Sequence, residues 1–134
     1  MPTVFEMIIN GDIPSKKVYE DDAVLAILDI NPRAKGHTLV ISKKVYPTIS
    51  EAPEDLIAHM FSVVKKIDSA MRINLKAEGT NVIINNSSAS GQEIPHLHIH
   101  VIPRKSDDGL SFFPPVCKYE EGEIDRYRSL IEIK

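Results

Sequence analysis

The sequence predicts a single domain of the α+β class, with an antiparallel sheet of about five strands, one long helix and shorter terminal helices. Several short segments alternate apolar and polar residues, which indicates strands, whereas the segment after Pro53 repeats apolar residues every three or four positions, which indicates a helix. Short connections between the strands favour antiparallel neighbours over repeating βαβ units. The 134 residues match the usual size of one domain, so we assign residues 1–134 to it.

The expected elements are separated by residues that typically end helices and strands. The first helix ends at Gly11, and Asn31, Pro32 and Gly36 mark a loop between two strands. The long helix begins near Pro53, and its apolar stripe consists of Leu56, Met60, Val63, Val64, Ile67 and Met71. In order, we expect a helix in 2–11, strands in 16–21, 23–29 and 37–42, the long helix until 76–79, strands in 80–86 and 96–104, and a helix in 122–134.

Composition excludes several classes of function. The net charge of −3 argues against a partner that is a nucleic-acid polymer, because such binding needs a basic surface. Cys117 is the only cysteine, so neither a disulfide framework nor a CxxC metal site is possible, and a lone thiol suits a reducing compartment. The sequence shows no signal peptide and no apolar run of about 20 residues. We therefore expect a cytoplasmic protein with no membrane partner.

Three of the five histidines, His96, His98 and His100, lie at alternate positions of one expected strand. Side chains alternate between the two faces of a strand, so the three imidazoles share one face, and Leu97 and Ile99 share the other. The apolar face should pack against the long helix. The histidine face should then look into a cleft or into solvent.

Three interpretations of this row remain open from the residues alone. The row can be an exposed strand face that happens to carry histidine. It can hold a metal ion, although its outer members lie ~13 Å apart, so an ion would take two of the three and a further ligand such as His37 or an acid. It can also divide nucleophilic attack on phosphorus and phosphate binding among different imidazoles.

The segment "HLHIHVI" at 96–102 resembles the signature of the histidine triad (HIT) family of nucleotide hydrolases and transferases. Three supporting blocks resemble the same family and cover most of residues 5–105: "IINGDIP" at 8–14, "ILDINPRAKGHTLVISKK" at 27–44 and "IINNSSASGQEIPHLHIHVIPR" at 83–104. The resemblance implies a HIT-like fold with a core of 5–105 and a C-terminal tail of 106–134, which matches the family less clearly.

The resemblance also implies catalytic roles. His98 would attack the α-phosphorus of a nucleoside 5′-phosphate derivative, and water would hydrolyse the nucleotidyl-histidine intermediate. His100 would contact the phosphate and the leaving group. His96 would hold the nucleophilic ring in its productive tautomer through a chain of hydrogen bonds, supported by His37. The implied substrates are purine nucleoside phosphoramidates or dinucleoside polyphosphates; the alternatives are a nucleotidyl transferase, a nucleotide-binding module with little turnover, and a His-ligated zinc enzyme.

Seven further positions are candidates for substrate binding. By resemblance, Asp29 would bind the ribose hydroxyls, and Asn85 and Gln92 would lie at the phosphate. The remaining four candidates are two walls of the base pocket and two members of a small, polar loop suited to an anion: Ile8, Ile30, Ser90 and Gly91.

Cofactor and partner expectations also rest on the resemblance. Some branches of the family hold a structural zinc, but Thr3 and Glu6 occupy its cysteine positions here and Val45 its histidine position, so we expect no metal site. No cofactor is required, although a divalent cation can accompany a polyphosphate substrate. We expect a homodimer that uses the long helix and one sheet edge, because unpaired edge groups seek partners.

Overall fold

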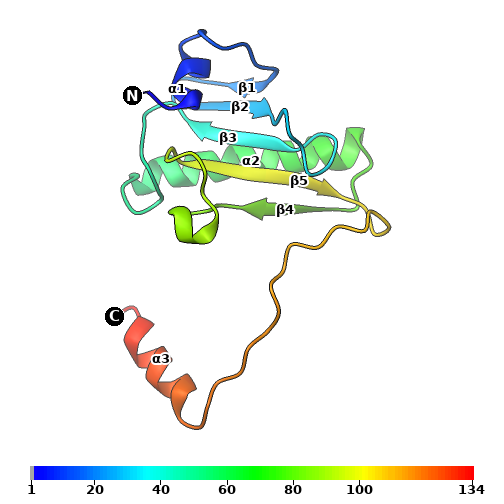
Figure 1. The fold of residues 1–134 in the computed structure, drawn as a ribbon. Helices are drawn as coiled ribbons and strands as arrows, with labels where there is room; N and C mark the ends of the chain where they lie inside the picture. The colour runs from blue at the N-terminus through cyan, green and yellow to red at the C-terminus, as the bar shows by residue number, and fades with distance from the viewer. Residues whose placement is uncertain (1) are drawn as a thin grey trace.

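The computed structural model describes residues 2–134 and confirms the predicted α+β fold, with one five-stranded antiparallel sheet and a long helix on one of its faces (Figure 1). The elements are α1 (Val4–Ile9), β1 (Lys17–Glu20), β2 (Val24–Leu28), β3 (Thr38–Ser42), α2 (Glu54–Asn74), β4 (Gly79–Ile83), the 3₁₀ turn η1 (Ser88–Ser90), β5 (His98–Arg104) and α3 (Glu123–Ile131).

The sheet has the strand order β1-β2-β3-β5-β4, so β5 lies in the interior and β4 forms one edge. All neighbouring strands are antiparallel, as the short connections predict. On β3, Ile41 pairs with His98 and Leu39 with His100. The pairing fixes which side chains flank each histidine.

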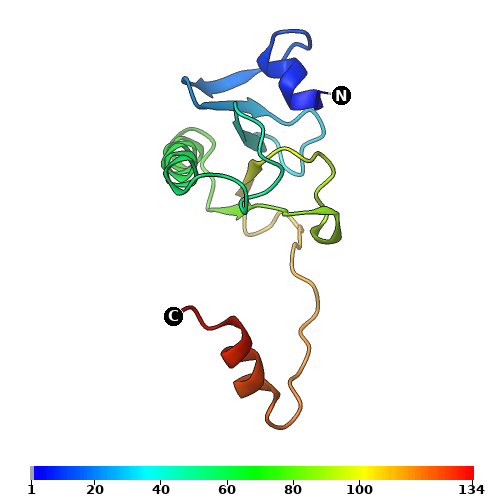
Figure 2. The ribbon, with the colours of Figure 1, turned by 90° about the vertical axis from the view of Figure 1, so that its left-hand side faces the viewer.

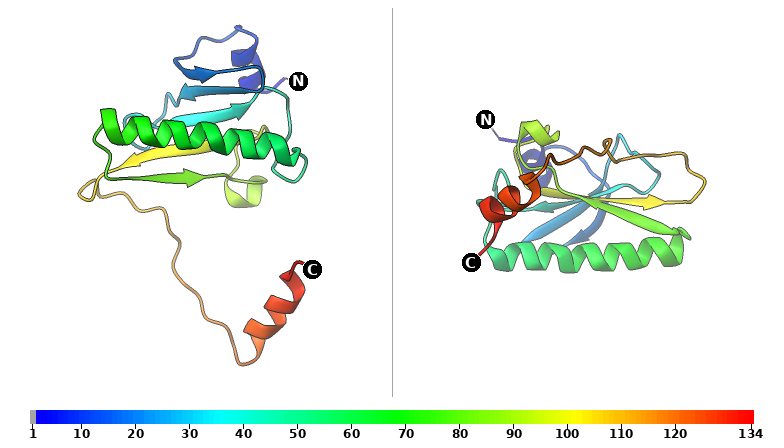
Figure 3. Two further views of the ribbon diagram at one scale, coloured as in Figure 1. Left: turned by 180° about the vertical axis from the view of Figure 1, so that it is seen from behind. Right: turned by 90° about the horizontal axis from the view of Figure 1, so that it is seen from below.

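Two apolar cores lie on opposite faces of the sheet. Leu97, Ile99 and Val101 pack with the buried stripe of α2 on one face, as their alternation predicts. On the other face, Phe5 of α1 packs over a smaller cluster of sheet residues: Leu25, Ile27, Leu39 and Ile41. Figures 2 and 3 show α2 on one side of the sheet and α1 on the other. The face under α1 is the one that carries His98 and His100.

Two strand boundaries differ from the sequence prediction. The last strand begins at His98 rather than at residue 96, because the main-chain N–H of Leu97 donates to Tyr46 in the loop after β3, at 2.7 Å. The strand expected in 80–86 covers Gly79–Ile83, and the residues that follow turn into the loop containing η1.

The chain after β5 leaves the body of the fold. Residues 110–120 contain no helix or strand, and α3 follows them at a distance from the sheet (Figure 1). The predicted C-terminal helix is confirmed, but none of its residues is buried. Within residues 2–134, none of the helices combines the length and the apolar character that crossing a bilayer requires.

Candidate active site

A cavity of about 840 Å³ opens on the face of the sheet that carries α1. It is bordered by α1, by the loop between β2 and β3, by the loop before β5 and by the first residues of the tail. Nine of the eleven site residues expected from the sequence line it: Ile8, Asp29, Ile30, His37, Asn85, Gly91, Gln92, His98 and His100. His96 and Ser90 do not.

His98 presents one particular nitrogen to this cavity. Its Nδ1 lies 2.6 Å from the main-chain oxygen of His96, and a carbonyl oxygen only accepts, so Nδ1 carries the hydrogen. The ring is 8% exposed, and Phe5 packs against it in an edge arrangement with the ring centroids 4.9 Å apart. Burial lowers the pKa of His98, which keeps the imidazole neutral at pH 7. The Nε2 atom therefore retains a free lone pair.

The ring of His96 lies outside the cavity and connects the sheet to α1. It is fully buried, and its Nε2 donates to the main-chain oxygen of Ser42 at 2.5 Å. Its Nδ1 consequently accepts from the hydroxyl of Thr3, at 2.9 Å. Burial lowers the pKa of His96 as well. The hydrogen bond that orients His98 thus comes from the main chain of His96, whereas the resemblance implied a chain of hydrogen bonds from His96 that His37 supports.

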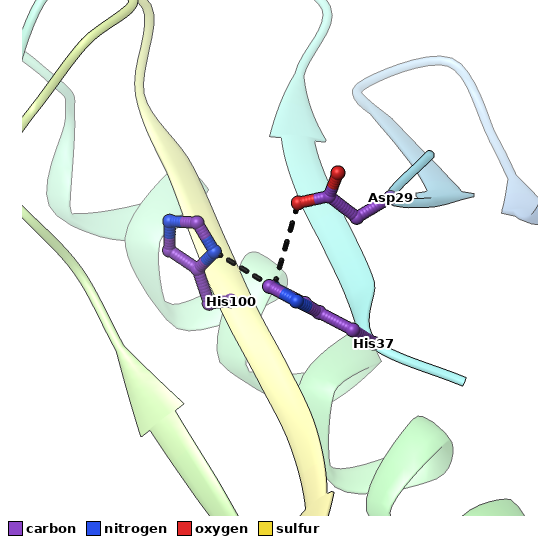
Figure 4. A group of neighbouring side chains, drawn as sticks. All are labelled: Asp29, His37 and His100. Atoms are coloured by element: carbon purple, nitrogen blue, oxygen red, sulfur yellow. Dashed lines mark hydrogen bonds and ion pairs between the residues drawn. The ribbon is translucent and has the colours of Figure 1, made fainter. Parts of the chain in front are cut away.

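His37 supports His100, which also differs from the expected arrangement. The main-chain N–H of Arg33 donates to Nδ1 of His37 at 3.0 Å, so the neutral His37 ring carries its hydrogen on Nε2. That Nε2 donates to Nδ1 of His100 at 2.9 Å, and it lies 3.7 Å from Oδ2 of Asp29 (Figure 4). A neutral His100 then carries its hydrogen on Nε2, where it is a hydrogen-bond donor.

Both rings of this pair are neutral at pH 7. Burial lowers the pKa of His37, and burial together with the neighbouring His98 and His37 lowers the pKa of His100 to about 4. The four histidines of the site therefore carry fixed tautomers and no charge. Such a set offers one nucleophilic nitrogen on His98 and a fixed donor on His100.

Asp29, His37 and His100 are also the candidate metal ligands in the described part of the chain. Ligand atoms of Asp29, His37 and His100 all lie within 4.8 Å of one another. A metal ion needs a lone pair on Nε2 of His37. The N–H of Arg33 places the hydrogen on that atom, so metal coordination there requires breaking the Arg33 hydrogen bond. The donor set fits a hydrogen-bond relay better than an ion.

The loop before β5 is held by its own polar side chains. The amide of Gln92 donates to the main-chain oxygen of Pro47 and accepts from the N–H of Ser87, both at 2.7 Å. The hydroxyl of Ser90 donates to the main-chain oxygens of Asn86 and Ser87. Gln92 borders the cavity while it fixes the loop, and Ser90 faces away from it.

Asn85 and Asp29 are better placed to meet a ligand directly. The side chain of Asn85 lines the cavity and forms no hydrogen bond with any residue between 2 and 134. One carboxylate oxygen of Asp29 accepts from the N–H of Asn31, and the other points toward His37. Ile30 is 90% exposed and lies at the rim of the cavity, where a flat apolar ligand can cover it.

Sequence reasoning missed four residues of the site. Arg33 is the only Lys or Arg side chain that lines the cavity among the described residues, and its guanidinium forms no ion pair there. Phe5, Phe112 and Thr3 contact the site from the two ends of the chain. Arg33 lies three positions before the Gly36-His37 pair, within the block at 27–44, which was a usable signal, but distant aromatic residues give none.

The chain is similar in sequence and fold to several known proteins. A family model described as HIT domain matches residues 10–107. An uncharacterised HIT-like protein of Methanocaldococcus jannaschii is 49% identical over 132 residues, covering 98% of each chain. The adenylylsulfatase HINT3 of Arabidopsis thaliana is 47% identical over 107 residues, covering 80% of this chain and 54% of its own length. The crystal structure of a HIT-family protein from Bacillus subtilis, 39% identical, superposes with a TM-score of 0.89 and covers 98% of this chain and 95% of that one.

Proposed function

Because the chain belongs to the HIT family, we propose that it is a hydrolase of purine nucleoside 5′-phosphate derivatives, acting at the α-phosphorus through a nucleotidyl-histidine intermediate. Family membership and the similarity to an adenylylsulfatase support the broader kind, a nucleotide hydrolase or transferase. The observation that carries the proposal is the neutral, buried His98, whose Nδ1–H is bound to a carbonyl and whose Nε2 is free.

The proposed reaction proceeds in two displacements. The lone pair on Nε2 of His98 forms a bond to the α-phosphorus while the bond from phosphorus to the leaving group breaks. The leaving group departs with those electrons, as an anion when it is sulfate or a polyphosphate, and with a proton taken from solvent when it is an amine. Water then attacks the same phosphorus and releases a proton to solvent, the P–N bond breaks, and the electron pair returns to Nε2 as the nucleoside monophosphate leaves. The hydrogen stays bonded to Nδ1 throughout and is donated to the main-chain oxygen of His96, which stabilises the positive charge of the intermediate.

The residues that line the cavity suggest how we would place each part of such a substrate. We assign the ribose hydroxyls to the carboxylate of Asp29 and the purine to the apolar surface of Ile8 and Ile30. Asn85 and the Nε2–H of His100 would donate to the phosphate oxygens, and the main chain at Gly91 and Gln92 closes that side. The leaving group would extend toward Arg33.

Three accompanying proposals follow from the same premise. The hydrolase needs no cofactor, although a divalent cation can bind together with a polyphosphate substrate. It acts on single nucleotides in the cytoplasm, with neither nucleic-acid polymers nor membranes as partners. It forms a homodimer through α2 and the exposed edge of β4, whose main-chain groups have no neighbouring strand in the sheet described here.

The test is single-turnover trapping of labelled AMP with three substrates: an AMP amine conjugate, a diadenosine polyphosphate and adenylyl sulfate. Wild-type protein should form a labelled covalent adduct and release AMP from at least one of them. His98→Ala should bind the nucleotide but lose roughly 10⁴-fold or more in turnover and form no adduct. His59→Asn, a change of the histidine on α2 outside the cavity, should leave both measurements near wild type.

Three outcomes separate the alternatives. If none of the three substrates yields adduct or AMP although nucleotide binds, the chain is a binding module and the hydrolase proposal is wrong. If activity disappears with a chelator, returns with zinc and survives in His98→Ala, the metal interpretation replaces it. Label that passes from the adduct to an added nucleotide rather than to water identifies a transferase.

A further inference from the structure

The cavity has a second apolar wall, on the side of the histidines away from α1. One residue of β4, one of β5 and two of the segment that follows β5 form this wall: Ile83, Ile102, Leu110 and Phe112. The side chain of Ile102 is 2% exposed, and those of Ile83 and Phe112 are partly buried. Most of this surface is therefore in place before a ligand binds.

Strand pairing places the second apolar wall directly beside His100. Leu39 of β3 and Ile83 of β4 pair with His100 from its two sides. Paired residues of neighbouring strands present their side chains on the same face of the sheet, and the strands lie about 4.8 Å apart. Apolar side chains thus flank His100 both toward α1, where the purine is assigned, and toward β4.

Arg104, the last residue of β5, holds the segment that supplies half of the wall. Its guanidinium binds both carboxylate oxygens of Asp108 at 2.7 and 2.8 Å and the main-chain oxygen of Leu110 at 2.7 Å. It also binds Asn81 of β4 at 2.6 Å and lies 5.0 Å from the centroid of the Phe112 ring. The segment after β5 is thus fixed against the sheet where Leu110 and Phe112 line the cavity.

The direction of the proposed displacement determines which part of a substrate can reach this wall. When attack is in line, the leaving group lies on the side of the phosphorus opposite the attacking atom. Along β5, Ile102 lies beyond His100 as seen from His98, ~13 Å from it by the strand rise. Asp29 and His37 approach His100 from the β3 side (Figure 4). With the ribose assigned to that side, the wall remains for the leaving group.

Arg33 borders the same end of the cavity from the opposite side. It lies in the loop that enters β3 at Thr38, and Thr38 pairs with Val101 of β5. The region beyond His100 therefore has a cationic residue on its β3 side and an apolar surface on its β4 side. The apolar surface has no role in binding a leaving group that consists of anionic groups alone.

The closeness of the wall to His100 limits the chemistry of the leaving group. An apolar group reaches a side chain one strand spacing away, about 4.8 Å, only if it lies within a few bonds of the phosphorus. The second base of a dinucleoside polyphosphate fails this condition, because further phosphates and a ribose separate it from the α-phosphorus. Sulfate has no apolar part. An amine that carries an aromatic ring one or two carbons from its nitrogen satisfies the condition.

We propose that Ile83, Ile102, Leu110 and Phe112 form a subsite for the leaving group, which selects AMP conjugates of amines with an aromatic ring close to the nitrogen. This inference rests on the hydrolase function proposed above and names the leaving group that the hydrolase prefers. The chemistry is unchanged: Nε2 of His98 bonds to phosphorus, the bond from phosphorus to the amine nitrogen breaks, and the amine takes a proton from solvent.

Affinity in the His98→Ala variant tests the subsite separately from turnover, because this variant should bind conjugates without cleaving them. Calorimetry compares AMP joined to benzylamine with AMP joined to methylamine, which differ only by the ring. The benzylamine conjugate should bind roughly tenfold or more tightly. Adding Phe112→Ala should remove most of this preference. Adding Phe113→Ala, a change of the 81% exposed neighbour that does not line the cavity, should preserve it.

Nuclear Overhauser effects locate the ring without any change to the wall. In His98→Ala protein with ¹³C-labelled isoleucine methyl groups, the ring protons of the bound benzylamine conjugate should give signals to Ile83 and Ile102. Signals to Ile8 and Ile30 instead would show that the ring occupies the surface assigned to the purine, and the proposal would be wrong.

The remaining outcomes separate failure of the subsite from failure of the hydrolase. Equal affinities for the two conjugates, or a preference that Phe112→Ala leaves intact, would overturn the subsite even if wild-type protein cleaves both conjugates. Release of no AMP from either conjugate by wild-type protein, with the preference for the ring still present in binding, would overturn the hydrolase alone. Binding of neither conjugate to wild-type protein would overturn both.

Discussion

At the scale of single residues, the site depends on which nitrogen of each imidazole carries a hydrogen. Main-chain groups make that choice at three of the four rings: the oxygens of His96 and Ser42 and the N–H of Arg33. His100 then takes its tautomer from His37. Because burial keeps all four rings neutral, the cavity holds no histidine cation, and Arg33 is its one cationic side chain among the described residues.

The position of Arg33 leads to a prediction about the leaving group. Leaving groups that depart as anions, such as sulfate or a nucleoside polyphosphate, should gain from the nearby guanidinium, whereas a neutral amine should not. Arg33→Gln is expected to lower kcat/KM roughly tenfold or more for adenylyl sulfate and diadenosine polyphosphate, and much less for an AMP amine conjugate. The main-chain N–H that binds His37 remains in the variant. Equal losses for all three substrates would show that Arg33 acts on the fold of the loop instead.

At the scale of elements, α1 is attached to the active centre through its first residues. Thr3 caps the helix by accepting from the N–H of Glu6, while the Glu6 carboxylate accepts from the N–H of Thr3. The same Thr3 hydroxyl donates to His96, and Phe5, two residues further on, packs against His96 and His98. Helix capping and alignment of the nucleophile therefore share one hydroxyl group.

Removing that hydroxyl should damage stability and catalysis together. Thr3→Val keeps the shape but deletes the cap and leaves Nδ1 of His96 without a donor, so we expect a loss of about 2 kcal/mol in the free energy of unfolding. Urea unfolding measures it, and kcat should fall because Phe5 and His98 shift. Thr3→Ser keeps the hydroxyl and should stay much closer to wild type. Identical urea midpoints for the two variants would rule out the hydrogen bond as the cause.

Element-level patterns in the sequence explain why some features were predictable. Alternation placed His98 and His100 on one face and Leu97 and Ile99 on the other, since strand geometry admits no other arrangement. Alternation does not mark where strand pairing begins, so it could not show that His96 precedes the strand and is enclosed by α1. The sequence could not predict the hydrogen bond from Gln92 to Pro47 either, because it joins two loops 45 positions apart.

At the scale of the whole molecule, four neutral histidines, three of them buried and His100 partly buried, make stability depend on pH. In the unfolded chain they take up protons below about pH 6.5, whereas their lowered pKa values in the folded state oppose protonation. Protons thus favour the unfolded state, and the free energy of unfolding should fall as the pH drops from 6.5 toward 4. The window ends near the His100 pKa of about 4, below which the loss from that residue is complete.

Urea midpoints at pH 7.5 and pH 5 measure this effect. His100 alone should contribute a loss on the order of 2 kcal/mol at pH 5. His100→Asn should therefore show a smaller difference between the two pH values than the wild type. A midpoint that does not change with pH would mean that these rings are protonated in the folded state.

The tail shows a limit of sequence reasoning at this scale. The spacing of Ile124, Tyr127 and Ile131 correctly predicts a helix with an apolar side. Periodicity shows only that the apolar side of this helix needs a surface to pack against. A search for that surface within one chain assumes that the tail folds back onto its own domain. Here Arg104 directs the chain outward, through contacts that no local pattern encodes.

The oxygen that orients His98 belongs to the peptide group joining His96 to Leu97. Every amino acid supplies such an oxygen, so no substitution at position 96 can delete this hydrogen bond. A loss of activity in a His96 variant therefore reports only on the missing imidazole ring. Side-chain mutagenesis will therefore miss one of the groups that orient the nucleophilic ring of His98. Chemical ligation that replaces this carbonyl by a thiocarbonyl, a weaker acceptor, is the way to expose its contribution.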